Sequence, residues 1–213
     1  CDRHIGIGAD GLVIIGPSDK GDLSMRIYNS DGSEAEMCGN AIRCISKYAY
    51  EEGIVRKRKM AVETLAGLII PELILKNDEV VSVRVDMGEP RLRSEEIPVL
   101  IEGDKVIGMP IEAAGQVFEI TCVSMGNPHC IVFVPDVHNF EFEKWGSEIC
   151  CNPLFPRQTN VEFIQVVDKH NVKMRVWERG AGETLACGTG ACAAAVAGAL
   201  NNKTCRRVSV HLA

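Results

Sequence analysis

The sequence lacks a Cys-x-x-Cys pair, a long apolar run and a dense basic stretch, and each absence removes a class of protein. Without Cys-x-x-Cys, the ten cysteines do not have the usual spacing of a structural zinc site. No apolar run is long enough to cross a bilayer and no signal peptide is visible, so we expect a cytoplasmic protein without membrane contact. The net charge of −6, with only residues 56–59 forming a short basic run, argues against nucleic acid as a partner.

The ten cysteines fit a reducing compartment. A disulfide scaffold would be shorter and would come with a secretion signal. Most of the thiols are therefore expected to be buried small apolar groups. Cys38 and Cys187 differ from the others because each directly precedes a glycine at the start of a helical pattern. These two cysteines are the candidates for chemistry.

An internal repeat surrounds these two cysteines. Residues 26–44 align with residues 175–193 at an offset of 149, which places Cys38 on Cys187 and the two following glycines on each other. Repetition at so long a distance indicates two similar domains rather than a solenoid. A site between two such domains would have one thiol from each.

A break in the strand pattern separates the two copies. It falls at the Gly- and Pro-containing residues 86–90, so we predict an N-terminal domain at 1–85 and a C-terminal domain at 86–213. The chain begins at Cys1 without a methionine and ends within a strand pattern. We therefore expect the first domain to lack its N-terminal strands and the second to lack its C-terminal return segment.

Hydrophobic periodicity predicts both helices and strands in each copy. A helical spacing covers residues 39–52, and the small apolar residues 188–200 predict a second helix, buried on all sides by sheet. Three short strands are expected within residues 60–85. The segment Met125-Gly126-Asn127-Pro128-His129 is expected to form a loop between two strands.

A cysteine at a helix start has distinctive chemistry. Unpaired backbone N–H groups and the helix dipole favour the thiolate, which predicts a lowered pKa for such a thiol. The same donors can hold a carboxylate, and Asn40 and Thr189 can add side-chain donors at matching positions. Two thiols on opposite faces of one carbon suit stereoinversion, in which one group removes a proton and the other returns one. No lysine has a recognisable Schiff-base setting, so a route without pyridoxal is expected.

Two further polar residues are candidates to deprotonate a neighbouring thiol. They are His129, which has Asn127 beside it, and Glu178, which ends the predicted strand before the Cys187 loop. An isolated histidine is more often a packed structural residue. For His129, the neighbouring Asn127 makes a functional role as good an interpretation as a structural one. Arg179 has two interpretations, a surface ion pair with Glu178 or a bidentate clamp on a second carboxylate.

At these residues the sequence resembles the diaminopimelate epimerase family. Residues 29–44 and 178–191 resemble its two thiol motifs, and Gly-Asn127-Pro-His129 and Thr-Asn160-Val-Glu match as well. The resemblance implies an α/β fold of two pseudo-symmetric domains, each a barrel-like sheet wrapped around a central helix. It implies epimerisation of LL-2,6-diaminopimelate to the meso form, in lysine and peptidoglycan precursor biosynthesis, without metal or cofactor. The implied partner is a small amino-acid substrate, and a homodimer is a candidate assembly.

The resemblance also implies roles for individual residues. Cys38 and Cys187 would be the acid/base pair, and His129 and Glu178 would tune the thiols. Asparagine side chains and Arg179 would address the distal, non-reacting end of the substrate. The implied substrate contacts are Asn29, Gly39, Asn40, Asn127, Asn160, Glu178, Arg179, Gly188 and Thr189.

Two other functions stay open from the residues alone. A proline or hydroxyproline racemase would follow the same two-thiol logic without a clamp for a distal carboxylate. A redox switch or thiol-binding module would join Cys38 and Cys187 in a regulatory disulfide, which requires their Cα atoms to approach closely. Exchange of the substrate α-hydrogen with solvent separates an epimerase from such a module.

Overall fold

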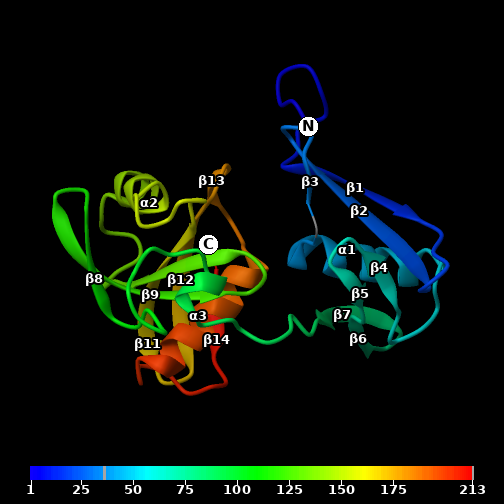
Figure 1. Ribbon diagram of the computed structural model, residues 1–213. Helices are drawn as coiled ribbons and strands as arrows, with labels where there is room; N and C mark the ends of the chain where they lie inside the picture. Colours follow the sequence, from blue (N-terminus) through cyan, green and yellow to red (C-terminus); the bar gives the residue numbers. More distant parts are fainter. Residues whose placement is uncertain (36, 213) are drawn as a thin grey trace. The chain divides into compact units, whose positions relative to one another are not determined.

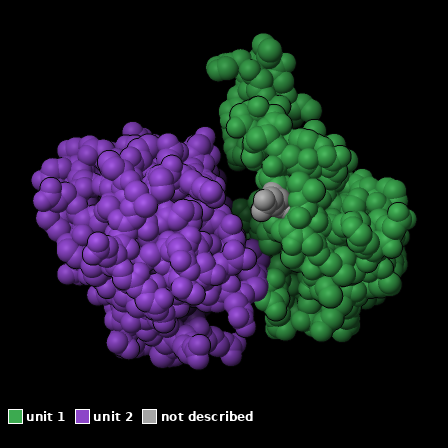
Figure 2. Space-filling view, viewed as in Figure 1, with its two compact units in different colours: residues 1–86 green, residues 87–213 purple. Residues whose placement is uncertain are grey.

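The computed structural model of the chain describes residues 1–35 and 37–212. They form two compact units, Cys1–Asp86 and Met87–Ala213, which are coloured separately in Figure 2. Glu36, within the first thiol motif, and Ala213 lie outside the described residues. No helix in the described part of the chain is long and apolar enough to cross a membrane.

The first unit packs one helix against a small sheet. Its elements are β1 (Gly11–Gly16), β2 (Leu23–Asn29), β3 (Glu34–Ala35), α1 (Gly39–Glu51), β4 (Val62–Thr64), β5 (Gly67–Ile69), β6 (Glu72–Lys76) and β7 (Glu79–Arg84). The sheet has the strand order β1-β2-β4-β5, with β3 paired to β2, while β6 and β7 form a separate hairpin (Figure 1). Ile42, Ile45 and Ala49 of α1 pack with Leu23 and Met25 of β2 in the core of this unit.

The region between residues 60 and 85 contains four strands, so the prediction of three was wrong. The difference lies at Pro71, between β5 and β6. Proline has no N–H to donate to a strand ladder, so the pairing that includes β5 ends there. The chain then forms the β6–β7 hairpin as a second sheet.

The second unit has a larger sheet between two helices. Its elements are a short 3-10 helix (Ser94–Glu96), β8 (Met109–Ala113), β9 (Gln116–Ser124), β10 (Pro128–Phe133), α2 (Phe142–Cys150), β11 (Asn160–Asp168), β12 (Asn171–Glu178), β13 (Gly182–Thr184), α3 (Gly188–Leu200) and β14 (Ser209–His211). The strand order is β13-β12-β11-β10-β9-β8, and β14 pairs with β12 in parallel. Figure 1 shows this sheet with α2 and α3 packed against it.

The two faces of this sheet form different cores because successive side chains of a strand point to opposite faces. Cys130 and Phe163 lie in the core that includes α2. Ile131 and Ile164, one position further along their strands, lie in the core that includes α3. Odd and even positions of each strand therefore have different chemical surroundings.

The sequence repeat appears in the pairing of the strands. β1 pairs antiparallel with β2, and β11 pairs in the same way with β12. The pair Val13–Ile27 in the first sheet corresponds to Glu162–Val176 in the second, at the offset of 149. In each unit the strand after the helix pairs in parallel with the long strand, β4 with β2 in the first unit and β14 with β12 in the second. These matches confirm the predicted α/β class with two pseudo-symmetric domains.

Helix α3 packs against several strands, but it is not buried on all sides, so that prediction was wrong. Its fully buried residues are Gly190, Ala193, Ala194, Ala197 and Gly198, and the other residues of the helix are partly exposed. The helix contacts β9, β10, β11, β12 and β14. Beyond Thr189 in its first turn, the helix is made of small apolar residues on every face, which gives no sequence signal for the face that packs, so the tertiary contacts decide it.

Candidate active site

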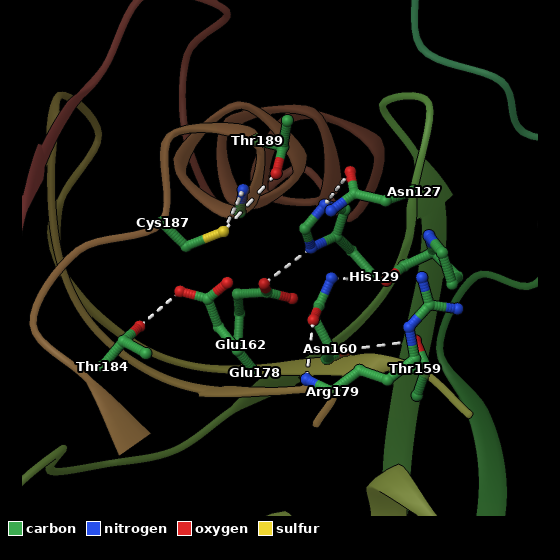
Figure 3. Close-up of polar contacts among 12 residues, drawn as sticks. Asn127, His129, Thr159, Asn160, Glu162, Glu178, Arg179, Thr184, Cys187 and Thr189 are labelled. Carbon is green, nitrogen blue, oxygen red and sulfur yellow. Dashed lines mark hydrogen bonds and ion pairs between the residues drawn. The ribbon is translucent and has the colours of Figure 1, made fainter. Parts of the chain in front are cut away.

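The second thiol motif places Cys187 at the start of α3. Cys187 is the N-cap residue, with extended backbone dihedrals, and its Sγ accepts a hydrogen bond from the Gly190 N–H at 3.4 Å. The Thr189 Oγ1 lies 3.4 Å from the same sulfur (Figure 3). The residue is 6% exposed. The predicted arrangement of a thiol at a helix start is therefore present in this unit.

Three titratable side chains point to the α3 face of the sheet. His129 in β10 lies two residues before Ile131, and Glu162 in β11 lies two residues before Ile164, which belong to the α3 core. Glu178 ends β12 at the same parity as Val176, another residue of that core. Strand alternation thus brings three groups from three neighbouring strands toward Cys187 (Figure 3).

His129 is completely buried and has a hydrogen-bond partner at each ring nitrogen. Its Nδ1 lies 2.7 Å from Glu162 Oε1, and its Nε2 lies 2.9 Å from Asn127 Oδ1. His129 and Glu162 are both 0% exposed. His129 belongs to strand β10, so the prediction that it lies in a loop was wrong. The parallel pairing of β10 with β11 draws the residue into the sheet opposite Asn160.

Glu178, the last residue of β12, contacts both Thr184 and the Cys187 thiol. Its Oε1 accepts a hydrogen bond from the Thr184 hydroxyl. Burial raises the pKa of the Glu178 carboxyl, against hydrogen bonds from Thr184 and Cys187 that lower it. A carboxyl with a raised pKa is a stronger base than an exposed one, which suits Glu178 to exchange a proton with the adjacent thiol.

The structure contradicts the expected thiolate at Cys187. Burial raises the pKa of the Cys187 thiol to about 12, and the nearby carboxylates of Glu162 and Glu178 add to the rise. Hydrogen bonds from Thr189 and Gly190 act in the opposite direction but are weaker. The helix N-terminus is thus outweighed by desolvation and by two negative charges, and the residue is a neutral thiol.

Asn160 and Arg179 are linked through the backbone. The Asn160 side chain accepts a hydrogen bond from the Arg179 N–H at 2.9 Å and donates one to the Pro128 carbonyl at 3.1 Å. The Arg179 guanidinium is exposed and donates to the Arg157 carbonyl at 3.0 Å. No ion pair of Arg179 occurs among residues 1–35 and 37–212, so the expected surface pair with Glu178 is not formed. The clamp interpretation stays a prediction.

The first unit has the equivalent thiol in a simpler setting. Cys38 is the N-cap of α1 and is partly buried, and its side chain makes no capping hydrogen bond. The Asn40 Oδ1 accepts from the Arg43 guanidinium at 2.5 Å. The exposed Asn29 donates from its side chain to Ser33 Oγ at 3.0 Å. Gly39 is buried at the first position of the helix, as the repeat predicts.

The structure brings the predicted residues together in two groups. The first unit holds Asn29, Cys38, Gly39 and Asn40, and the second unit holds Asn127, His129, Asn160, Glu178, Arg179, Cys187, Gly188 and Thr189. Within the described residues, no three His, Cys, Asp or Glu side chains are grouped as metal ligands.

Three residues of the site have no role predicted from the sequence, namely Glu162, Thr184 and Gly190. Glu162 lies in the Thr-Asn160-Val-Glu motif, and strand alternation from Asn160 places it on the same face. Thr184 contacts Glu178 across the β12–β13 pairing. Gly190 lies against Glu162, and no local pattern in the sequence reveals that contact.

Sequence comparisons with known proteins point to one family. The sequence model of diaminopimelate epimerase matches residues 1–93 and 121–213. The diaminopimelate epimerase of Pelotomaculum thermopropionicum is 61% identical over 212 residues, which covers 100% of this chain and 76% of the relative. That of Desulfitobacterium hafniense is 57% identical over 212 residues, covering 100% of this chain and 75% of the relative.

Solved structures of lower sequence identity share the fold. A hydroxyproline epimerase from Agrobacterium vitis matches with a TM-score of 0.65 and 14% identity, over 93% of this chain and 63% of that one. A phenazine biosynthesis protein of the PhzF family from Bacillus anthracis matches with a TM-score of 0.64 and 18% identity, over 91% of this chain and 67% of that one. At these identities the likeness concerns the fold alone. The full-length sequence matches show that this chain belongs to the diaminopimelate epimerase family.

Proposed function

We propose that this chain epimerises LL-2,6-diaminopimelate to the meso form by two-thiol acid/base catalysis without a cofactor. The proposal rests on one observation: each unit has a cysteine at the N-cap position of its equivalent helix, Cys38 at α1 and Cys187 at α3. Each of the predicted domains, 1–85 and 86–213, would supply one thiol. The names of the relatives point to diaminopimelate as the substrate.

In the proposed reaction a proton leaves one face of the α-carbon and another arrives at the opposite face. One cysteine, as thiolate, takes the α-proton and becomes a thiol. The electron pair moves into the adjacent carboxylate, where backbone N–H groups at a helix start stabilise the charge. The other cysteine, as thiol, gives its proton to the carbon and becomes a thiolate. The reverse reaction exchanges the two roles.

The surroundings of Cys187 suit the proton-donating role. Its raised pKa keeps the proton on sulfur at neutral pH, and the proton leaves when a carbanion forms beside it. For the opposite role, Glu178 is the group next to the thiol that can accept its proton. His129 is the third group of this cluster and would tune the thiols.

Binding of the substrate would use both ends of the molecule. Gly39 and Asn40, with Gly188 and Thr189, would hold the reacting amino-acid end at the helix starts. Asn29, Asn127, Asn160 and Arg179 would address the distal end. We place the protein in the cytoplasm and propose a homodimer as its assembly, which sedimentation velocity would test.

The direct test is chiral analysis of diaminopimelate after incubation of LL-diaminopimelate with the protein in reductant, without added cofactor. The expected result is a mixture of LL and meso isomers, with solvent deuterium at the α-carbon when the reaction is run in deuterium oxide. Unchanged LL substrate without label would refute the proposal. It would leave a thiol-binding module as the better interpretation.

The Arg179→Met variant tests the substrate. Loss of the guanidinium removes the proposed clamp for the distal carboxylate, so KM for diaminopimelate should rise by about 10-fold or more with a smaller change in kcat. Arg157→Met is the control. It removes an exposed arginine side chain but keeps the backbone carbonyl of residue 157, which accepts the hydrogen bond from Arg179. Undiminished activity of Arg179→Met on diaminopimelate would contradict the proposed clamp, and with it the argument against a proline-type substrate, which has no distal carboxylate.

A further inference from the structure

The buried pair of Glu162 and His129 is not explained by the folding of the unit. Both side chains are 0% exposed, and they meet at 2.7 Å between Oε1 and Nδ1. The other carboxylate oxygen, Oε2, is buried and has no hydrogen-bond partner within the described residues. Burial of a carboxylate with one oxygen unsatisfied costs stability, so a role outside packing is expected.

Helix α3 makes room for this carboxylate at Gly190. A Cβ at position 190 would lie 2.5 Å from Glu162 Oε1. The backbone of Gly190 is helical, so its conformation does not require glycine. Glycine lowers helix stability relative to alanine, and the close approach of the carboxylate is the structural reason to keep it.

The first unit shows that the fold does not need this pair. At the offset of 149, the counterparts of Glu162 and Gly190 are Val13 and Ala41. Val13 pairs with Ile27 as Glu162 pairs with Val176, so the positions are equivalent. Val13 and Ala41 lie in the apolar core beside α1. The same supersecondary unit is thus built with an apolar pair in one copy and with a carboxylate against glycine in the other.

We propose that Glu162 is a positioning residue that fixes the proton of His129 on Nδ1, so that Nε2 is the ring nitrogen that exchanges protons at the site. An ionised carboxylate only accepts hydrogen bonds, so Nδ1 must donate to it. A carboxylate behind a histidine selects the tautomer and orients the ring in the same way in catalytic triads and at metal ligands.

Asn127 provides a partner for Nε2 in both of its protonation states. When Nε2 carries a proton, the Asn127 Oδ1 accepts a hydrogen bond from this N–H, and the two heavy atoms lie 2.9 Å apart. When Nε2 is free, the amide can rotate and donate through Nδ2. In the hydrogen-bonded chain from Glu162 through His129 to Asn127, Nε2 of His129 is thus the ring nitrogen that can gain or lose a proton. The catalytic consequence rests on the proposed epimerase function, whereas the choice of tautomer does not.

The test is the tautomer of His129 in protein labelled with nitrogen-15 histidine, read from long-range nitrogen–proton correlations without substrate. His129→Gln assigns the signal among the five histidines. We expect a single neutral tautomer with Nδ1 protonated. In Glu162→Gln the amide can donate to Nδ1 as well as accept from it, so a mixture of tautomers is expected. An Nε2-protonated wild-type ring, or a pure Nδ1-protonated ring in Glu162→Gln, would overturn the proposal.

The double variant Glu162→Val/Gly190→Ala copies the apolar pair of the first unit and is the sharper activity test. We expect it to fold, to lose the single tautomer and to lower kcat by about 10- to 100-fold with KM nearly unchanged. Glu119→Gln, an exposed glutamate of β9, is the matched control and should keep the wild-type tautomer and rate. Retention of the Nδ1 tautomer in a folded double variant would contradict the role of Glu162. If no variant, including wild type, epimerises diaminopimelate, the tautomer measurement still decides the positioning role.

Discussion

The protonation state of Cys187 follows from competition between a helix start and its buried surroundings. The first-turn N–H and the Thr189 hydroxyl favour a thiolate, but burial and two carboxylates favour the neutral thiol and prevail. Thiolate is the form that attacks disulfides and oxidants, so a thiol with a raised pKa is poorly suited to a redox switch. The same property suits a proton donor.

The raised pKa of Cys187 predicts a pH dependence of stability. Because the folded-state pKa lies above the unfolded value, this contribution is fully present below about pH 9 and is lost as pH rises toward about 12. We expect the free energy of unfolding to fall by on the order of 1 kcal/mol per pH unit in this window. Urea unfolding at a series of pH values measures it.

Cys187→Ala should have a weaker pH dependence than wild type in that window. The comparison between variants is needed because burial also raises the pKa of Cys130 and Cys150, which adds a slope common to both proteins. Equal slopes for wild type and Cys187→Ala would show that Cys187 ionises normally in the folded chain.

Substitution of either capping cysteine should remove inversion. Cys38→Ala or Cys187→Ala should abolish the reaction, and serine at either position should lower kcat by about 100-fold or more because an alcohol is a far weaker acid. The exposed Cys44 and Cys205, one in each unit, give the matched alanine controls. Near-wild-type epimerisation by a serine variant would remove that cysteine from proton transfer.

At the scale of elements, the two copies share an ion pair but bury it differently. Arg26 donates to Glu34 in the first unit, and Arg175 donates to Glu183 in the second, each between the long strand and the short strand that follows it. The side chain of Arg26 is 56% exposed and that of Arg175 is 20% exposed.

Arg175 has two contacts beyond the ion pair, and its ring contact is shorter than that of Arg26, whose guanidinium lies 5.4 Å from the centre of the Tyr28 ring. Arg175 donates to the Val137 carbonyl at 3.2 Å, and its guanidinium lies 3.8 Å from the centre of the Phe142 ring. Arg175→Met should lower the free energy of unfolding by about 2 kcal/mol, and Arg26→Met by a smaller amount. Urea midpoints compare the two variants, and equal losses would mean that the extra contacts add nothing.

At the scale of the whole molecule, each unit has its own core. The apolar cluster around α1 lies entirely within residues 13–85, and the clusters around α2 and α3 lie within residues 92–210. The segment between them, residues 86–90, has no regular structure, and Asp86 is exposed. Endoproteinase Asp-N, which cuts on the amino side of aspartate, should therefore cleave first before Asp86 and yield two fragments that resist further digestion. Mass spectrometry identifies the cut, and early cleavage within β11 or β12 would argue against two compact units.

Much of the fold was predictable because it depends on local patterns. Small apolar residues after Cys187 predict helix α3, and alternating residues before Glu178 predict strand β12. The repeat predicts that Cys38 and Cys187 cap equivalent helices. The exposed face of α3 and the strand position of His129 were not predictable, since both depend on partners distant in sequence.

The sequence by itself determined the duplicated α/β unit, the two helix-capping thiols and the family, because motif spacing and periodicity are properties of neighbouring residues. Only the tertiary structure decided that Cys187 is a neutral thiol and that Glu162 lies against His129 and Gly190. The physical reason is that burial and the approach of charges from other strands set proton affinities, and both arise only after β10, β11, β12 and α3 have packed together.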